Sequence, residues 1–228
     1  GEGGRRRPRT ARPPKRLLEV GGKPLIAGHV ERLAAAGVRE VFINTAHLAE
    51  QFPARLGDGS DWGGQIHWSH EGEQALETGG GLLQALPLLG EAPFIIVSAD
   101  IWCDFDFCAL PGQPEGLAHL LLVDNPPHHR GGDFELDASG KLRAAVDSGS
   151  EQDRLTFSGI ALCRPALLAN WRRVIGDTEG ARETPPRFRL APILHAAAAQ
   201  GRLTGQKHIG AWTDVGTPER LHQLAQSL

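Results

Sequence analysis

The sequence predicts an α/β protein with a doubly wound, mostly parallel sheet flanked by helices. Continuous apolar runs at 94–98 (FIIVS) and 119–123 (HLLLV) are typical of strands buried on both faces. Segments with helical spacing alternate with such runs, and this alternation favours a parallel sheet. The length of 228 residues and the hydrophobic content of 40% suit one domain with a sizeable core better than two small ones.

In the first half of the chain, residues 1–16 are rich in Gly, Arg and Pro and are expected to form a loop. Residues 24–36 have helical spacing, with Leu25, Ile26 and Val30 on one side, and Gly37 closes the segment. The elements expected after it are a strand at 39–44, a helix around 48–56, a strand at 65–69, and a helix at 82–89 opened by a Gly-rich segment at 77–81.

The second half is expected to continue the alternation. Residues 133–136 and 141–146 have the pattern of a hairpin, and Pro218 after Thr217 is a helix start signal. The other expected elements are strands at 94–98, 119–123 and 156–162, helices at 165–174 and 190–200, and a last helix from Pro218.

Charge is distributed unevenly along the chain. The formal net charge is only -3, which argues against bulk attraction to nucleic acid or membranes. Residues 1–16 hold seven basic side chains and one acidic one, which gives +6 locally and -9 for the remainder. Such a basic arm can bind nucleic acid or can serve as the anion-binding loop of a site.

The three cysteines, Cys103, Cys108 and Cys163, have a spacing that matches no metal template. Their odd number is most simply explained by a reducing cytoplasm. The sequence has no signal peptide and no apolar run near 18 residues, so no membrane span is expected.

Two carboxylates follow predicted strands. Asp100 comes directly after the apolar run at 94–98, and Asp214 lies in the segment GAWTDVGTP at 210–218. Ligands in open α/β sheets sit beyond the carboxyl ends of strands, and Mg²⁺ takes one or two carboxylates together with substrate phosphates. For each Asp alone, a turn or helix-cap role is an alternative; together they predict a metal pair.

Two Gly-rich segments are candidates for phosphate or nucleotide contacts. Gly1-Glu2-Gly3-Gly4-Arg5 exposes backbone N–H groups that can wrap an anion, and Arg5 and Lys15 can pair with phosphate oxygens. It is not a P-loop, since no Gly-Lys-Ser/Thr follows. Glu77-Thr78-Gly79-Gly80-Gly81 precedes a helix, where a base or sugar can approach the backbone. A disordered tail and a plain helix entry are the respective alternatives.

Together these segments resemble the sugar-1-phosphate nucleotidyltransferase family. Residues 1–10 and 14–17 fit the family's Gly-x-Gly-x-Arg and Pro-Lys-Pro-Leu elements, with Arg6, Arg9 and Arg16 as departures. The family's strand-end Asp corresponds to Asp100. Its Trp-x-Asp-x-Gly-Thr, Leu-Gly-Thr-Ala/Gly-Gly and Gly-Ile elements correspond to segments 212–217, 76–80 and 157–160. The resemblance implies the Rossmann-like nucleotide-diphospho-sugar transferase fold as one domain over 1–228, with the family's first strand ahead of Gly1.

The resemblance also implies substrates and roles. An oxygen of a sugar-1-phosphate would attack the α-phosphorus of a nucleoside triphosphate and release pyrophosphate, with Mg²⁺ as cofactor. Segments 71–81, 123–126, 132–134, 156–160 and 190–192 are most similar to the branch that uses UTP and N-acetylmuramic acid α-1-phosphate in peptidoglycan recycling. The implied residues are Arg5 and Lys15 for catalysis; Gly1, Glu2, Gly3, Lys15, Glu77, Thr78 and Gly79 for the nucleotide; Gly132, Asp133, Ser158, Gly159 and Arg189 for the sugar; and Asp100 and Asp214 for the metal.

Alternatives remain within and outside this activity. Mannose- or heptose-1-phosphate guanylyltransferases and glucose-1-phosphate thymidylyltransferases belong to the same class. A non-catalytic subunit that senses sugar nucleotides is a different class. The presence of Arg5, Lys15, Asp100 and Asp214 argues against it, because a sensor could lose these residues. A nucleic-acid binder using the basic arm is disfavoured, because the chain lacks interleaved aromatic residues. The expected partners are the two small substrates, with no nucleic acid or membrane, in the cytoplasm; the oligomeric state stays open.

Overall fold

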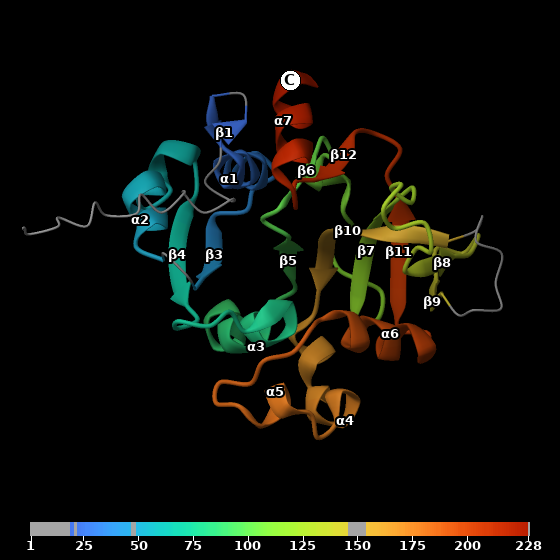
Figure 1. Cartoon of the computed structure of the whole chain (residues 1–228). Coiled ribbons are helices and arrows are strands. Elements are labelled where there is room, and N and C mark those ends of the chain that lie inside the picture. The colour runs from blue at the N-terminus through green and yellow to red at the C-terminus, as the bar shows by residue number, and fades with distance from the viewer. Residues whose placement is uncertain (1–18, 21, 47–48, 146–153, 228) are drawn as a thin grey trace, which may run out of the picture.

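The computed structural model describes residues 19–20, 22–46, 49–145 and 154–227. The predicted residues Gly1, Glu2, Gly3, Arg5 and Lys15 lie outside this part of the chain. Within it, a central sheet is flanked by helices (Figure 1), which confirms the α/β fold class.

The largest sheet is mixed rather than mostly parallel. Its strands are ordered β11 (Leu203–Lys207), β7 (Ala118–Val123), β10 (Arg154–Cys163), β8 (Phe134–Leu136) and β9 (Leu142–Ala144), and β5 (Phe94–Val97) also pairs with β10. Only the β11–β7 pairing within it is parallel. The long strand β10 runs antiparallel to β5, β7 and β8. Hydrophobic runs such as β7 show burial on both faces but do not encode strand direction, so this part of the expectation was wrong.

A second, parallel pair stands apart from that sheet. β3 (Glu40–Thr45) pairs in parallel with β4 (Gln65–His70), as βαβ units do, with α2 (Gln51–Leu56) between them in the chain. β3 and β5 both line a cavity of 620 Å³, whose other walls include apolar side chains of α1 (Leu25–Ala35) and of α3 (Glu77–Leu89). Figure 1 shows β3 and β5 beside each other. Among the described residues, no strand pairs with either of their facing edges.

Helix α3 begins five residues earlier than expected. Its first turn contains Gly79 and Gly80, which disfavour a helix, but both N–H groups donate to the Phe188 carbonyl at 2.9 and 3.1 Å. The first N–H groups of a helix lack partners within the helix, so this contact stabilises the start. A Cβ on Gly79 would lie 2.6 Å from the Phe188 ring, which shows that the chain needs Gly for this close approach.

The remaining helices lie where they were expected, except that one predicted helix is split into two. The predicted helix at 165–174 is a 3₁₀ turn at Pro165–Leu168 followed by α4 (Trp171–Ile175), and α5 (Glu179–Arg182) was not expected. The expected helices at 190–200 and from Pro218 are α6 (Ala191–Ala199) and α7 (Pro218–Ser227). Short strands missed from the sequence are β6 (Ile101–Cys103), β12 (Trp212–Asp214), β11, and the hairpin of β1 (Glu19–Val20) and β2 (Lys23–Pro24). No described helix has the length and apolar character needed to cross a membrane.

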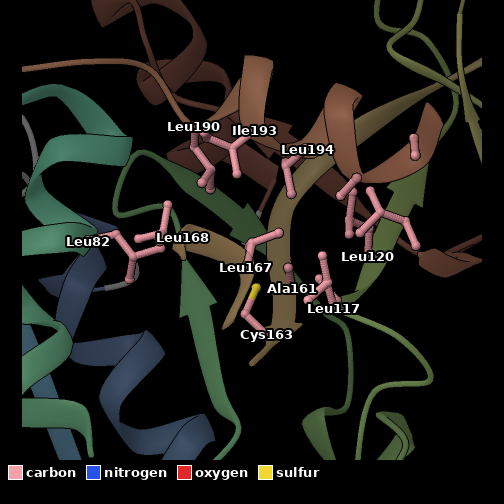
Figure 2. Packing of buried hydrophobic residues seen from close by; sticks show 14 of the residues in the cluster. Leu82, Leu117, Leu120, Ala161, Cys163, Leu167, Leu168, Leu190, Ile193 and Leu194 are labelled. Atoms are coloured by element: carbon pink, nitrogen blue, oxygen red, sulfur yellow. The ribbon is translucent and has the colours of Figure 1, made fainter. Parts of the chain in front are cut away.

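The main core joins the mixed sheet to the helices on one of its faces. Leu120 of β7 and Ala161 of β10 are fully buried, and Leu190, Ile193 and Leu194 of the α6 region pack against this sheet (Figure 2). A separate cluster packs Val30 of α1 with Ile43 of β3, Ile66 of β4 and Phe52 of α2. The packing of these two clusters positions the segments that carry the polar residues described next.

Candidate active site

The two predicted metal ligands are brought together by a short antiparallel ladder. β6 pairs with β12, and the register sets Asp214 opposite Ile101, the residue after Asp100. The Val215 N–H donates to the Asp100 carbonyl at 2.8 Å, which extends the ladder by one more bond. Asp100 and Asp214 therefore lie on neighbouring chain segments, and both line one cavity of 750 Å³.

That cavity collects most of the described residues that the sequence singled out. Asp100 and Asp214 lie on its wall. Predicted nucleotide residues on the same wall are Glu77 and Thr78, and predicted sugar residues are Asp133, Ser158, Gly159 and Arg189. These residues come from α3, β10, β12 and the loops after β5, β7 and α5. Segments far apart in the sequence thus form one concave site of a size that suits a small-molecule substrate.

Asp214 is held by two side chains that the sequence analysis did not assign. Its Oδ1 is 2.9 Å from Nη2 of Arg220 and accepts the Gly216 N–H at 3.2 Å, and its Oδ2 is 2.9 Å from Nε2 of His128. Arg220 Nη1 also lies 3.0 Å from the His128 ring. The Asp214 side chain is only 22% exposed, so these contacts compensate for its partial desolvation.

The segment around Ser158 and Gly159 forms a rigid part of the wall. The Trp212 indole N–H donates to the Ser158 carbonyl at 2.9 Å, and the buried Ser158 hydroxyl accepts the Ile160 N–H at 3.1 Å. Gly159 has a φ of +88°, and a Cβ there would lie 2.7 Å from the Ser98 hydroxyl. Glycine is therefore required at this position by both backbone conformation and space.

Asp133 links the loop after β7 to the sheet. Its Oδ2 accepts the Phe157 N–H at 2.8 Å, and its Oδ1 is 3.0 Å from Nε2 of His129. Gly132 is not among the residues that line the cavity. A Cβ there would meet Arg154 and Asn125 at 2.8 and 2.9 Å, so its reason for being glycine is packing against β10.

Glu77 and Arg189 face each other at the other side of the cavity. Arg189 Nε lies 3.6 Å from Glu77 Oε2, and the Arg189 side chain is 81% exposed. Glu77 has a φ of +60°, in the left-handed region that non-glycine residues rarely adopt. Gly79, predicted as a nucleotide contact, does not line the cavity, and its N–H is already donated to Phe188.

Comparison with known proteins decides the family. Residues 1–114, half of the chain, match the family described as Nucleotidyl transferase. The chain is 45% identical to an N-acetylmuramate alpha-1-phosphate uridylyltransferase of Neisseria meningitidis serogroup B, over all of this chain and 94% of that protein. It is 34% identical to a protein of the same name from Caulobacter vibrioides, over 96% of this chain and 90% of that one. This chain belongs to the nucleotidyl transferase family.

Solved structures show the same fold for this nucleotidyl transferase. A Bacillus anthracis protein described as a glucose-1-phosphate thymidylyltransferase, in complex with sucrose, superposes with a TM-score of 0.76 at 19% identity, covering 93% of this chain and 85% of that one. HddC from Yersinia pseudotuberculosis gives a TM-score of 0.69 at 18% identity, covering 94% and 89%. At such identities the likeness bears on the fold alone, and it confirms the expected nucleotide-diphospho-sugar transferase architecture.

The nucleotidyl transferase site contains contacts that sequence reasoning missed. His128 and His129, to which the sequence analysis gave no role, line the cavity with side chains 47% and 43% exposed. Arg220, in the first turns of α7, was not singled out. Its signal in the sequence is weak, because it lies six positions after Asp214, inside an ordinary amphipathic helix. Trp212, by contrast, belongs to the recognised motif and supports Ser158.

The donor chemistry of the Asp pair fits Mg²⁺. Both groups are carboxylates, which are hard oxygen ligands, and both line the same cavity. A carboxylate has about four lone-pair sites. The three contacts to Asp214 therefore leave acceptor capacity on its oxygens. Asp100 is exposed to solvent on the same wall, and its side chain can accept a ligand without breaking a hydrogen bond or ion pair to another described residue.

Proposed function

We propose that this nucleotidyl transferase transfers a uridylyl group from UTP to N-acetylmuramic acid α-1-phosphate, giving UDP-N-acetylmuramic acid and pyrophosphate. The observation that carries the proposal is the 45% identity, end to end, with the N. meningitidis uridylyltransferase. The shared cavity of Asp100, Asp214 and the predicted sugar and nucleotide residues supports it. A role in peptidoglycan recycling and a cytoplasmic location follow as parts of the same proposal.

The reaction we propose is an in-line displacement at the α-phosphorus. A phosphate oxygen of the sugar-1-phosphate forms a new bond to that phosphorus, and the bond to the bridging oxygen of pyrophosphate breaks. The sugar phosphate is already ionised at neutral pH, so no general base is needed. Catalysis of this kind relies mainly on positioning and charge neutralisation.

Each group of residues has a proposed task in that reaction. Asp100 and Asp214 would hold Mg²⁺, which supplies charge neutralisation for the reacting phosphates when bound. Arg5 and Lys15 would stabilise charge on the triphosphate as it transfers. Gly1, Glu2 and Gly3 would contact the phosphates, and Glu77 and Thr78 the nucleoside. Asp133, Ser158, Gly159 and Arg189 would line the sugar side.

A guanylyltransferase is the second candidate. The chain is 29% identical to a mannose-1-phosphate guanylyltransferase catalytic subunit beta of Danio rerio over 96% of its own length, but it spans only 60% of that protein. A non-catalytic sensor is less well supported, because Asp100 and Asp214 are both present and line one cavity. The nucleotide that the chain uses therefore separates the main alternatives.

We assign residues 1–228 to one nucleotidyltransferase domain, to which the family's first strand adds in the space between β3 and β5. The cavity there is lined on two sides by strands, at Val41 and Ile43 of β3 and at Ile95 and Val97 of β5. Apolar side chains and two strand edges without described partners are what an added strand needs for burial and hydrogen bonding.

The deciding experiment measures pyrophosphate release with each of four nucleoside triphosphates against a panel of sugar-1-phosphates. The panel holds N-acetylmuramate, N-acetylglucosamine, glucose and mannose 1-phosphates, each with Mg²⁺ and with excess chelator. The expected result is release that depends on Mg²⁺ and is fastest with UTP and the muramate substrate. Preference for GTP with mannose 1-phosphate would overturn the substrate assignment, and no release with any pair would favour a sensor.

A further inference from the structure

Three unlike donor groups meet at the far end of β6, away from the cavity that holds Asp100 and Asp214. They are the Cys103 thiol, the Asp104 carboxylate and the His208 imidazole, and their ligand atoms all lie within 4.8 Å of one another. None of the three lines the candidate active site. The sequence did not indicate the cluster, because His208 is far from the cysteine in the chain and reaches it only through the fold.

Two strand ends bring the groups together. Cys103 ends β6 opposite Trp212 of β12, and the Asp104 N–H donates to the Ala211 carbonyl at 3.1 Å. His208 follows β11 directly, and its N–H donates to the Leu122 carbonyl of β7 at 2.8 Å. The backbone positions of all three residues are thus fixed by the sheet.

The side chains are oriented as well. His208 Nε2 is 2.7 Å from Asp104 Oδ1, and the His208 ring packs edge-on against Phe105 with centroids 5.6 Å apart. A Cβ on Gly210 would lie 2.4 Å from Asp104 Oδ1 and 2.7 Å from His208 Nε2. Glycine at this position therefore leaves the space in which the two donor atoms meet.

Burial and exposure differ across the cluster in a way that suits an ion entering from solvent. Cys103 is 1% exposed, the His208 side chain is 13% exposed, and the Asp104 side chain is 47% exposed. The sulfur is at the bottom, and the carboxylate is at the rim. Burial raises the pKa of the Cys103 thiol, against the smaller opposing effects of the Phe105 backbone and of Arg32, so the thiolate forms together with the sulfur–metal bond.

We infer that Cys103, Asp104 and His208 form a binding site for a borderline-soft divalent cation of the Zn²⁺ class, separate from the carboxylate pair of the active site. Thiolate, imidazole and carboxylate are the three ligand types that Zn²⁺ takes in proteins, whereas Mg²⁺ takes oxygen ligands. The two negative charges of one thiolate and one carboxylate equal the 2+ charge of the ion. The fourth tetrahedral position, on the exposed side of Asp104, takes water.

Only small movements are needed for binding. In a tetrahedral zinc site with bonds of about 2.0 Å, nitrogen and oxygen ligand atoms stand roughly 3.3 Å apart. The 2.7 Å contact between His208 Nε2 and Asp104 Oδ1 must therefore open slightly. The S–H bond of Cys103 breaks as the sulfur–metal bond forms, and its proton goes to solvent. No electron is transferred, and no other reactant is required.

The bound ion would have a structural role. It would tie the end of β6 to the start of the 208–211 segment, which leads into β12 and Asp214. Metal binding to the folded state stabilises that state by mass action. The site would thus stiffen the ladder that holds Asp100 and Asp214 side by side, without contacting substrate.

The test is a titration of the full chain, freed of metal by chelation, with Co²⁺ as a spectroscopic probe and Zn²⁺ as competitor. The expected result is a thiolate-to-cobalt charge-transfer band that saturates near one equivalent and is abolished by Zn²⁺. Cys103→Ser should remove the band, and Cys108→Ser, which alters an exposed cysteine outside the cluster, should leave it unchanged. Zn²⁺ should also raise Tm of the wild type but not of Cys103→Ser.

Two further variants guard against a folding defect in Cys103→Ser. Asp104→Asn and His208→Gln keep the thiol and change groups nearer the surface, and each should weaken Co²⁺ binding by about tenfold or more. A missing thiolate band in the wild type would overturn the inference. So would a band that survives in Cys103→Ser, a band lost in Cys108→Ser, or unchanged affinity in both Asp104→Asn and His208→Gln.

Discussion

Asp214 carries more contacts than its partner in the candidate metal pair. Arg220 and His128 hold its two oxygens, whereas Asp100 is exposed and is positioned through its backbone. The two carboxylates therefore contribute differently. We propose that Asp214 is the preset ligand of the pair and that Asp100 reorients when the metal and the phosphates bind.

Substitution of either carboxylate should abolish turnover. We expect Asp100→Asn and Asp214→Asn each to lose pyrophosphate release while remaining folded, because the amide keeps the shape but cannot hold Mg²⁺ as firmly. Raising Mg²⁺ should restore part of the activity. Asp177→Asn is the matched control, since Asp177 is 82% exposed and paired with Arg182 away from the cavity. Near-wild-type rates in either active-site variant would remove that residue from the metal assignment.

Arg189 is the residue we expect to discriminate between sugars. N-acetylmuramate carries a lactyl carboxylate that N-acetylglucosamine lacks, and Arg189 is an exposed cation on the cavity wall, bound only loosely to Glu77. Arg189→Ala should lower kcat/KM for the muramate substrate. The corresponding loss of transition-state stabilisation should be about 1.5–3 kcal/mol, the typical value of a charge-assisted hydrogen bond. The glucosamine substrate should be unaffected.

The exposed Arg173, which lies outside the cavity, supplies the control. Its replacement by Ala should change neither substrate's kcat/KM. Equal losses on both sugars in Arg189→Ala, or no loss on either, would leave Arg189 as an ordinary solvated side chain.

At the scale of elements, the start of α3 depends on a tertiary contact. The glycines of its first turn are unfavourable for a helix, yet they allow Phe188 to approach closely. The Phe188 carbonyl then accepts hydrogen bonds from two N–H groups of that turn. The same approach places Glu77 and Thr78 on the cavity wall. The helix start and the site geometry therefore depend on one packing arrangement.

Adding a single methyl group should reveal this dependence. Gly79→Ala places a Cβ 2.6 Å from the Phe188 ring, and we expect it to lower the free energy of unfolding by about 1–3 kcal/mol, as overpacking does. Gly28→Ala, in the middle of α1 with no atom within 4 Å of the new Cβ, should instead stabilise by up to about 1 kcal/mol. Urea unfolding of both variants checks the pair. Equal effects would show that the Phe188 contact does not decide where α3 begins.

At the scale of the whole molecule, folding buries a histidine that must stay neutral. Burial and, to a smaller extent, the nearby Arg32 together lower the pKa of His29 on α1 to about 4, against the effect of its bond to the Ile101 carbonyl at 2.8 Å. The unfolded chain, with a histidine pKa of about 6.5, binds more protons below that pH. The contribution of the neutral His29 to the free energy of unfolding is therefore fully present above about pH 6.5, and it is lost as the pH falls towards 4.

The expected loss over that interval is about 3 kcal/mol. In His29→Gln, the amide can still donate to the Ile101 carbonyl, and this part of the pH dependence should disappear. His222→Gln, which changes an exposed histidine of α7, should retain it. Denaturant unfolding at several pH values between 4 and 7 measures the slope. A wild-type slope that His29→Gln leaves unchanged would exclude His29 as its source.

The cavity between β3 and β5 gives a second prediction at this scale. A chain that carries an apolar β-strand segment ahead of Gly1 should have a higher Tm than residues 1–228, since the added strand buries apolar surface and pairs two strand edges. Each kcal/mol gained corresponds to about 2–4 °C for a chain of this size. An extension of equal length made of Gly and Ser is the control. Equal Tm values for both extensions would show that the cavity does not accept a strand.

The sequence by itself determined the elements and the chemistry that depend on local pattern. Apolar runs located β5 and β7, helical spacing located α1 and α6, and the motif around Asp214 indicated the family. These features are local because burial on both faces and helical periodicity are written in consecutive residues. The residues at 1–15 belong to the same sequence-based prediction and lie outside the described residues.

Only the tertiary structure decided how separate segments meet. Strand direction in the mixed sheet, the early start of α3 against Phe188, and the contacts of His128 and Arg220 with Asp214 join residues distant in the chain. The cluster of Cys103, Asp104 and His208 is a further example. Such contacts result from packing and hydrogen bonding between elements, and the local pattern of a single sequence carries little information about them.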